Sequence, residues 1–205
     1  MLIKLYEENP NPKHLRQLSE CLMDGGVIVY PTDTLYGFGC SIFKPKAIER
    51  IARIKNIEVG NNTFSIVCNS ISQIADYAKP INNQYFKIIR KCLPGPYTFI
   101  LEANNKIPKH LHRKKKHVGL RIPDNNITQE LVRMLGNPMI SSTVPIIDNE
   151  IEYTTDPELI NEKYGDMVDF VIDAGYGELE PSTIIDMTGS EYEIIREGKG
   201  KRIRN

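Results

Sequence analysis

The chain has 205 residues, of which 40% are hydrophobic, and its 26 basic and 26 acidic side chains give a formal net charge of zero at pH 7. This length and composition allow one domain, residues 1–205 with a core of about 15–200. The balanced charge means that an anionic partner must be met by a local basic cluster. The four cysteines form no Cys-x-x-Cys pair, which argues against a zinc ribbon or a disulfide framework. Because no signal-peptide pattern or membrane-length apolar run is present, we expect a cytoplasmic protein with no membrane partner.

Two helices and a buried strand are predicted in the first 55 residues. Asn11-Pro12 has the composition of an N-cap followed by proline at the first helical position, and Gly25-Gly26 is typical of a helix end. The run from Val27 to Tyr30 does not alternate polar with apolar residues, so we expect a central strand that is covered on both faces and ends at Pro31. A second helix is predicted from Pro45 to about Lys55.

The segment from Thr32 to Gly39 follows this strand and combines four polar side chains with two glycines. Glycine lets a backbone bend sharply or approach a ligand closely. We therefore predict a binding loop at the end of the buried strand. A polar turn with a structural role alone fits the residues equally well, because short motifs often match by chance.

Short strands and helices alternate through the rest of the chain without a regular βαβ period. The predicted strands are 64–68, 97–101, 118–122, 139–143, 170–173, 182–186 and 192–195, and the predicted helices are 71–78, 81–93, 127–135 and 157–163. Leu93–Pro96 has the composition of a turn. This irregular order predicts an α/β fold with a single twisted, mixed sheet flanked by helices.

The segment from Ala103 to Pro123 contains basic residues and histidines but no acid. Phosphate groups of RNA or of a nucleotide are natural partners of such a segment. The predicted RNA-binding residues are Arg113, Lys114, Lys115 and Lys116, with a solvated loop as the alternative. The histidines stand among cations that would repel a metal ion, so we predict no protein metal site.

A second group of residues is suited to a small polar ligand with phosphates. Arg121 lies inside the apolar run from Val118 to Pro123, where a cation needs a carboxylate or a ligand as its partner. No P-loop, Rossmann or zincin motif is present. Hydroxyl side chains that orient a ligand, with cations that hold phosphates, would suit an adenylate-forming site. The candidates are Thr32, Thr34, Ser141–Thr143, Ser182, Thr183, Lys55, Arg121 and Arg196.

The order of these motifs resembles the YrdC/YciO family over nearly the whole chain. The matching stretches are Gly26–Gly39, Lys55, Pro94–Phe99, Val118–Pro123, Ile140–Thr143, Pro181–Asp186 and Arg196–Gly198. The resemblance implies a twisted α/β fold around a positively charged concave groove that binds double-stranded RNA or tRNA. The family's enzymes are L-threonylcarbamoyladenylate synthases, which convert L-threonine, bicarbonate and ATP into threonylcarbamoyl-AMP and pyrophosphate for the t6A modification of tRNA.

Carried over position by position, the resemblance implies a role for seven residues. Threonine would contact Thr32, Arg121, Ser141 and Ser182, and the nucleotide would contact Lys55, Thr143 and Arg196. The substrate ATP would be accompanied by Mg2+. Because a threonine carbamate attacks the α-phosphorus directly, the protein positions the reactants and neutralises charge, and we assign no catalytic nucleophile.

Two departures from the family's synthases favour the YciO-like branch. The synthases carry Lys-x-Arg-Pro after the second helix, where this chain has Lys55-Asn-Ile57-Glu58. They also carry Ser-Ala-Asn at a later strand end, where this chain has Thr143-Val-Pro145, so proline replaces a side chain that can both donate and accept hydrogen bonds. The alternative to a synthase is therefore a diverged protein that binds RNA or an adenylate without synthase activity.

Overall fold

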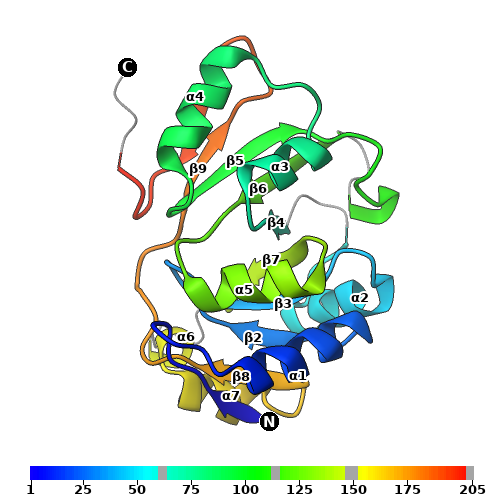
Figure 1. Ribbon diagram of the computed structural model, residues 1–205, viewed down its shortest axis with the longest axis vertical. Coiled ribbons are helices and arrows are strands. Elements are labelled where there is room, and N and C mark those ends of the chain that lie inside the picture. Colours follow the sequence, from blue (N-terminus) through cyan, green and yellow to red (C-terminus); the bar gives the residue numbers. More distant parts are fainter. Residues whose placement is uncertain (60–63, 112–115, 146–151, 202–205) are drawn as a thin grey trace.

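Ten strands form one twisted mixed sheet in the part of the chain that the computed structural model describes, residues 1–59, 64–111, 116–145 and 152–201 (Figure 1). The strands are β1 (Leu2–Lys4), β2 (Ile28–Tyr30), β3 (Gly37–Ser41), β4 (Ser65–Val67), β5 (Tyr97–Glu102), β6 (His117–Arg121), β7 (Met139–Thr143), β8 (Phe170–Asp173), β9 (Thr183–Asp186) and β10 (Glu193–Arg196). Their order across the sheet is β1-β8-β2-β3-β7-β4-β6-β5-β9-β10.

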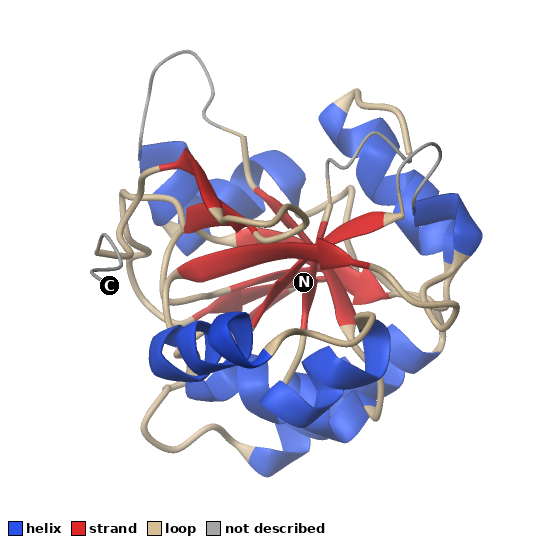
Figure 2. Cartoon of the chain, turned by 90° about the horizontal axis from the view of Figure 1, so that it is seen from above, coloured by secondary structure: helices blue, strands red, loops and turns tan. Residues whose placement is uncertain are grey.

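Helices lie on both sides of this sheet (Figure 2). They are α1 (Pro12–Met23), α2 (Pro45–Lys55), α3 (Ile71–Tyr77), α4 (Asn83–Cys92), α5 (Asn126–Leu135), α6 (Glu152–Thr155) and α7 (Pro157–Tyr164), with a 3-10 turn η1 (Lys109–Leu111). Strand pairs β1/β8, β2/β8, β4/β6 and β5/β9 are parallel, and the other pairs are antiparallel. The predicted mixed α/β sheet is confirmed. Among the described residues, no helix is both long and apolar enough to span a bilayer.

Strand β2 is covered on both faces, as its uninterrupted apolar run predicts. Val27 and Val29 pack into one core cluster with α2 and α7, while Ile28 and Tyr30 pack into a second cluster with α1 and α5. All four side chains are fully buried. Burial of one large apolar side chain stabilises the fold by about 1.5–3 kcal/mol, so this strand is a rigid base for the residues that follow it.

The helix ends agree with their sequence signals. The Asn11 side chain caps α1 by accepting a hydrogen bond from the Lys13 amide, and Pro12 occupies the first turn. Helix α2 ends at Asn56, which has a left-handed φ of 52°, and α5 ends at Gly136 with φ 72°. These two residue types tolerate the left-handed conformation best.

The prediction that Gly37 and Gly39 lie in a binding loop was wrong, because both belong to strand β3, which pairs with β2 and β7. A Cβ atom on Gly39 would lie 2.8 Å from Cε1 of Tyr30. Glycine at this position therefore makes room for a packed ring rather than for a ligand. The short elements β1, η1 and α6 also have no counterpart among the predicted elements.

Candidate functional site

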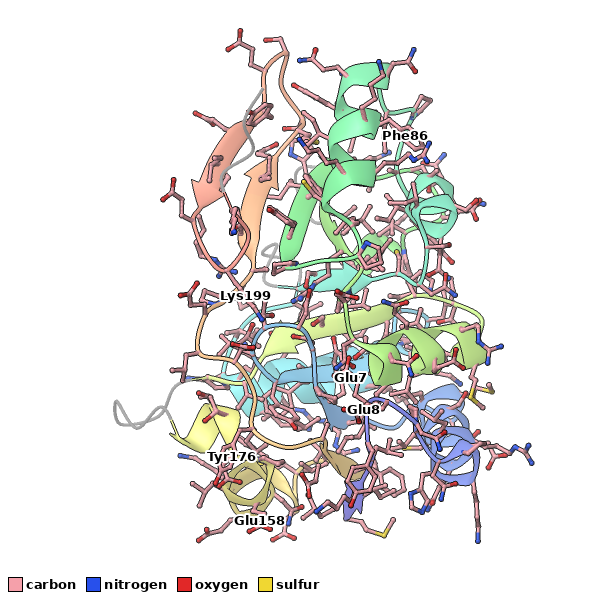
Figure 3. The ribbon with its side chains drawn as sticks, turned by 60° about the vertical axis from the view of Figure 1, so that its left-hand side comes forward. Glu7, Glu8, Phe86, Glu158, Tyr176 and Lys199 are labelled. Carbon is pink, nitrogen blue, oxygen red and sulfur yellow. The ribbon has the colours of Figure 1, made fainter. Side chains whose placement is uncertain are left out.

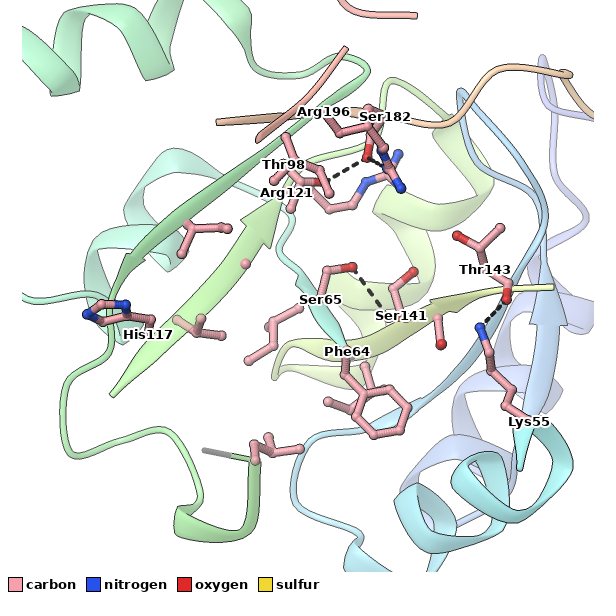
Figure 4. Close-up of a pocket in the computed structure, with 18 residues that line it drawn as sticks. Lys55, Phe64, Ser65, Thr98, His117, Arg121, Ser141, Thr143, Ser182 and Arg196 are labelled. Carbon is pink, nitrogen blue, oxygen red and sulfur yellow. Dashed lines mark hydrogen bonds between the residues drawn. The ribbon is translucent and has the colours of Figure 1, made fainter. Parts of the chain in front are cut away.

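A cavity of about 340 Å3 opens among strands β4 to β7, β9 and β10 (Figure 4). It brings together six of the seven residues predicted to contact threonine or nucleotide: Lys55, Arg121, Ser141, Thr143, Ser182 and Arg196. These residues are far apart in the sequence, and the first and last of them are Lys55 and Arg196. The charged side chains among its described lining residues are basic, and none is a carboxylate.

The floor of the cavity is built by three paired strands. Ser65 of β4 is in register with Gly119 of β6 and with Ser141 of β7. A Cβ atom on Gly119 would lie 3.1 Å from Cγ2 of Thr98 and would narrow this floor. Small side chains therefore keep the centre of the sheet open, and the longer cations reach in from its margins.

Arg121 lies at the end of β6 and is 6% exposed. Its Nη2 donates hydrogen bonds to Oδ1 of Asp33 at 2.7 Å and to Oγ1 of Thr34 at 3.2 Å. The expectation that this cation needs an anionic partner is confirmed, because Asp33 supplies one. The Arg121 Nε is buried and has no hydrogen-bond partner among the described residues. A buried donor without a partner is uncommon in proteins.

Arg196 reaches into the same end of the cavity from β10. Its Nε and Nη2 donate to the main-chain oxygen of Ser182 at 3.1 and 2.8 Å, and Nη2 also donates to Oγ of Ser182 at 3.2 Å. That hydroxyl is 2.9 Å from Oγ1 of Thr98. Burial, and then the positive charge of Arg121, lower the pKa of Arg196. Two cations that repel each other in one cavity form a site that a bound anion would stabilise.

Lys55 lies at the last position of α2, and its Nζ donates to the main-chain oxygen of Thr143 at 2.5 Å. Burial lowers the pKa of Lys55 to about 8. The ammonium group therefore remains mostly protonated at neutral pH but titrates just above it. In Figure 4 it lies on the opposite side of Ser141 from the two arginines, so the cavity has a cation at two of its margins.

Ser141 is held by a buried tyrosine that sequence reasoning placed in the core alone. Tyr30 donates a hydrogen bond from Oη to Oγ of Ser141 at 2.6 Å. Burial raises the pKa of Tyr30 to about 12, so the group stays a donor at neutral pH. The sequence contains one indication of this role, a tyrosine in an otherwise aliphatic strand, because a buried phenol usually has a hydrogen-bond partner.

Thr32 does not join the other six predicted residues. It lines a second cavity of about 350 Å3, together with Asp33 and Lys199. Its Oγ1 donates to the main-chain oxygen of Leu35 at 2.8 Å and accepts from the amide of Thr34 at 3.0 Å. The hydroxyl therefore stabilises the turn after β2. Figure 3 labels Lys199, which donates from Nζ to the main-chain oxygen of Asp33 at 2.8 Å.

The predicted RNA-binding residues are only partly described. Arg113, Lys114 and Lys115 lie outside the described residues, whereas Lys116 is exposed and directly precedes β6. Leu111 and His117, on either side of this segment, both line the first cavity. The described residues that flank positions 112–116 therefore lie at the cavity.

The positions where this chain departs from the synthases lie close to Lys55 and Thr143. Ile57 is half-buried and Glu58 is exposed. The Ile57 amide donates to the main-chain oxygen of Ala52, which completes the end of α2. Pro145 is half-buried and follows Thr143 by two residues. None of Ile57, Glu58 and Pro145 is among the described residues that line the cavity.

Comparison with known proteins identifies the fold and the family. A family model with the description "Telomere recombination", Sua5_yciO_yrdC, matches residues 20–198. The chain belongs to the Sua5/YciO/YrdC family. The YciO protein of Escherichia coli is 37% identical over 197 residues, which cover 96% of this chain and 94% of that protein. Its crystal structure matches with a TM-score of 0.90 and covers 98% of this chain and 97% of that chain. The family resemblance predicted from the sequence is confirmed.

Two further members of the Sua5/YciO/YrdC family have a ligand or an activity in their names. The threonylcarbamoyl-AMP synthase of Vibrio campbellii is 26% identical over 189 residues, which cover 91% of this chain and all of that protein. The crystal structure of Pyrococcus abyssi Sua5 complexed with L-threonine matches with a TM-score of 0.85 at 22% identity, and covers 97% of this chain and 57% of that chain. This second similarity shows a shared fold.

Proposed function

We propose that the first cavity binds L-threonine and ATP and forms threonylcarbamoyl-AMP and pyrophosphate from them and bicarbonate. The observation that supports this most is the lining itself, in which Arg121, Arg196 and Lys55 surround serine hydroxyls with no carboxylate among the described residues. Such a lining suits a ligand that is both anionic and rich in hydrogen-bonding groups. The synthase of V. campbellii and the threonine complex of P. abyssi Sua5 supply the substrates by analogy.

In this proposal, different residues of the cavity hold different parts of the reactants. Arg121, with the Ser141 and Ser182 hydroxyls, would hold the carboxylate and hydroxyl of threonine. Lys55, Arg196 and the main chain at Thr143 would hold the phosphates. Each charge-assisted contact of this kind contributes about 1.5–3 kcal/mol, so the loss of one would reduce affinity by about ten- to a hundredfold.

The reaction needs no covalent intermediate on the protein. The threonine nitrogen bonds to the carbon of CO2 derived from bicarbonate and loses a proton, which gives a carbamate. A carbamate oxygen then attacks the α-phosphorus, and the bond from that phosphorus to the leaving pyrophosphate oxygen breaks. Chain residues contribute by aligning the two reactants and by neutralising the phosphate charge.

Mg2+ would enter on the phosphates of ATP. Mg2+ prefers carboxylate oxygens and water as its ligands, whereas the described cavity lining offers hydroxyls, main-chain groups and cations. These residues do not fit a magnesium site of the protein's own.

A binding measurement tests this proposal. In isothermal titration calorimetry, L-threonine and Mg·ATP should each bind with a stoichiometry of one, and Ser182→Val should weaken threonine binding by about tenfold or more, since it removes a hydrogen-bonding group from the site. Thr188→Val, outside the cavity, is the matched control and should bind as the wild type does. Absence of binding of both ligands to the wild type would refute the proposal.

RNA binding without synthase activity is the second candidate function. The observation in its favour is that Leu111 and His117, which flank the basic residues 113–116, both line the cavity. The phosphates of a tRNA or double-stranded RNA backbone would neutralise these basic residues. A filter-binding assay should show salt-sensitive binding that is weakened when Lys114, Lys115 and Lys116 are replaced by alanine. Absence of binding at low salt would exclude this function.

A further inference from the structure

We propose that Asp33 is a positioning residue, which holds the Arg121 guanidinium in the orientation that binds the anionic group of the substrate. The inference rests on the proposed function of the first cavity, where Arg121 is a lining residue. Asp33 itself lines the second cavity and does not line the first. It therefore acts on the ligand through Arg121 rather than by touching it.

Asp33 is held firmly enough to define the position of its partner. Both side chains of the Asp33–Arg121 pair are 7% exposed, and their closest atoms, Oδ1 and Nη2, are 2.7 Å apart. Oδ2 of Asp33 accepts from the Asp124 amide at 3.0 Å, and its main-chain oxygen accepts from Nζ of Lys199 at 2.8 Å. Both carboxylate oxygens of Asp33 therefore have a defined partner, and the carboxylate has little freedom to move.

These contacts anchor one nitrogen of the Arg121 guanidinium. Nη2 carries two hydrogens, and its two acceptors are Asp33 and Thr34. Nε is buried and has no partner among the described residues. Because guanidinium is planar and presents its donors in a rigid fork, anchoring Nη2 also fixes the direction of Nε. Because Arg121 lines the first cavity, this anchoring also fixes the orientation in which an oxyanion there would meet the guanidinium.

A purely electrostatic role for Asp33 makes the opposite prediction. A carboxylate beside Arg121 reduces the positive potential of the cavity, so its removal would tighten anion binding if charge alone mattered. If Asp33 orients Arg121, its removal weakens anion binding although the cavity becomes more positive. The direction of the change in affinity therefore separates the two roles.

The test uses Asp33→Asn, with Asp124→Asn as the matched control. Both partners of the Asp33 carboxylate, Arg121 Nη2 and the main-chain N–H of Asp124, are hydrogen-bond donors. The side chain of asparagine has one acceptor oxygen and one NH2 donor, so its NH2 group would face one of these donors and that hydrogen bond would be lost. Asp124→Asn removes an equal charge from an exposed side chain nearby. With L-threonine and inorganic pyrophosphate as probes in calorimetry, Asp33→Asn should weaken binding of at least one probe by about tenfold or more, and Asp124→Asn should change it by less than about twofold. Unchanged or tighter binding by folded Asp33→Asn would overturn the proposal.

A second readout separates this inference from the proposed function. The Arg121 Nε–H group should give a rigid 15N resonance in the wild type, and Asp33→Asn should increase its mobility and its exchange with solvent. If the wild type binds neither probe, the proposed function fails, and the Nε resonance still decides on Asp33. An unchanged resonance in Asp33→Asn would refute positioning. If Asp33→Asn does not fold, Thr34→Val removes the other acceptor of Nη2, and the same changes in affinity and mobility are expected.

Discussion

Replacement of Gly39 by alanine tests how the core supports the floor of the cavity. The new Cβ would lie 2.8 and 2.9 Å from ring carbons of Tyr30 and 3.1 Å from Sδ of Met139. Tyr30 and Met139 are both fully buried, so neither has free space into which to move. Overpacking of this kind costs about 1–3 kcal/mol. Displacement of the ring would also break the Tyr30–Ser141 hydrogen bond, which contributes about 1 kcal/mol.

Together these costs predict a loss of about 2–4 kcal/mol in the free energy of unfolding for Gly39→Ala. Urea denaturation measures this loss directly, and a chain of this size should show a fall in Tm of about 4–16 °C. Tyr30→Phe is the matched control, because it removes only the hydroxyl and should cost about 1 kcal/mol. The double variant Gly39→Ala/Tyr30→Leu lacks the ring that the new Cβ contacts. Its loss in the free energy of unfolding should therefore be smaller than the sum of the losses in the two single variants. A Gly39→Ala protein within about 0.5 kcal/mol of the wild type would refute the packing argument.

Four further predictions concern ligand binding, folding stability and pyrophosphate release. Because burial lowers the pKa of Lys55 to about 8, ATP affinity measured by calorimetry should fall as the pH rises through about 8, and Lys55→Met should lack this dependence. The same lowered pKa has a consequence for folding stability. Between about pH 8 and pH 10.5, Lys55 is protonated in the unfolded chain but largely deprotonated in the folded protein, so the Lys55 contribution to the free energy of unfolding rises with pH in this range. Arg196→Met should weaken pyrophosphate binding by about ten- to a hundredfold with little change in Tm, and an unchanged affinity would remove Arg196 from the site. Ile57→Arg should raise threonine-dependent pyrophosphate release, and equal rates in the two proteins would show that this departure from the synthases has no effect on phosphate contacts.

The elements that the sequence predicts well have strong local causes. Strand β2 follows from four consecutive apolar residues, and α1 follows from a capping Asn11 with Pro12 behind it. Strand β3 was missed because Gly37 and Gly39 weaken a strand pattern, and Gly39 has to be glycine because a tyrosine ring on the neighbouring strand fills the space of its Cβ. That reason is a tertiary contact, which local sequence does not contain.

The sequence predicts which residues belong to the site better than it predicts the contacts between them. Hydroxyls and cations at strand ends predict six residues that line one cavity. Thr32 lies in a different cavity because its hydroxyl turns back onto Leu35 and Thr34. Asp33 and Arg121 are 88 positions apart in the sequence. Their pairing depends on the tertiary contact between β6 and the turn after β2, so the local sequence does not predict it.

Product formation tests the central claim most directly. Purified protein incubated with L-threonine, bicarbonate and Mg·ATP should yield threonylcarbamoyl-AMP, detected by mass spectrometry, with an equal amount of pyrophosphate, and omission of threonine should abolish both products. Arg121→Met should reduce the rate by about tenfold or more, since it removes a charge-assisted contact. Absence of threonylcarbamoyl-AMP with the folded wild-type protein would contradict the claim that this cavity forms an adenylate of threonine.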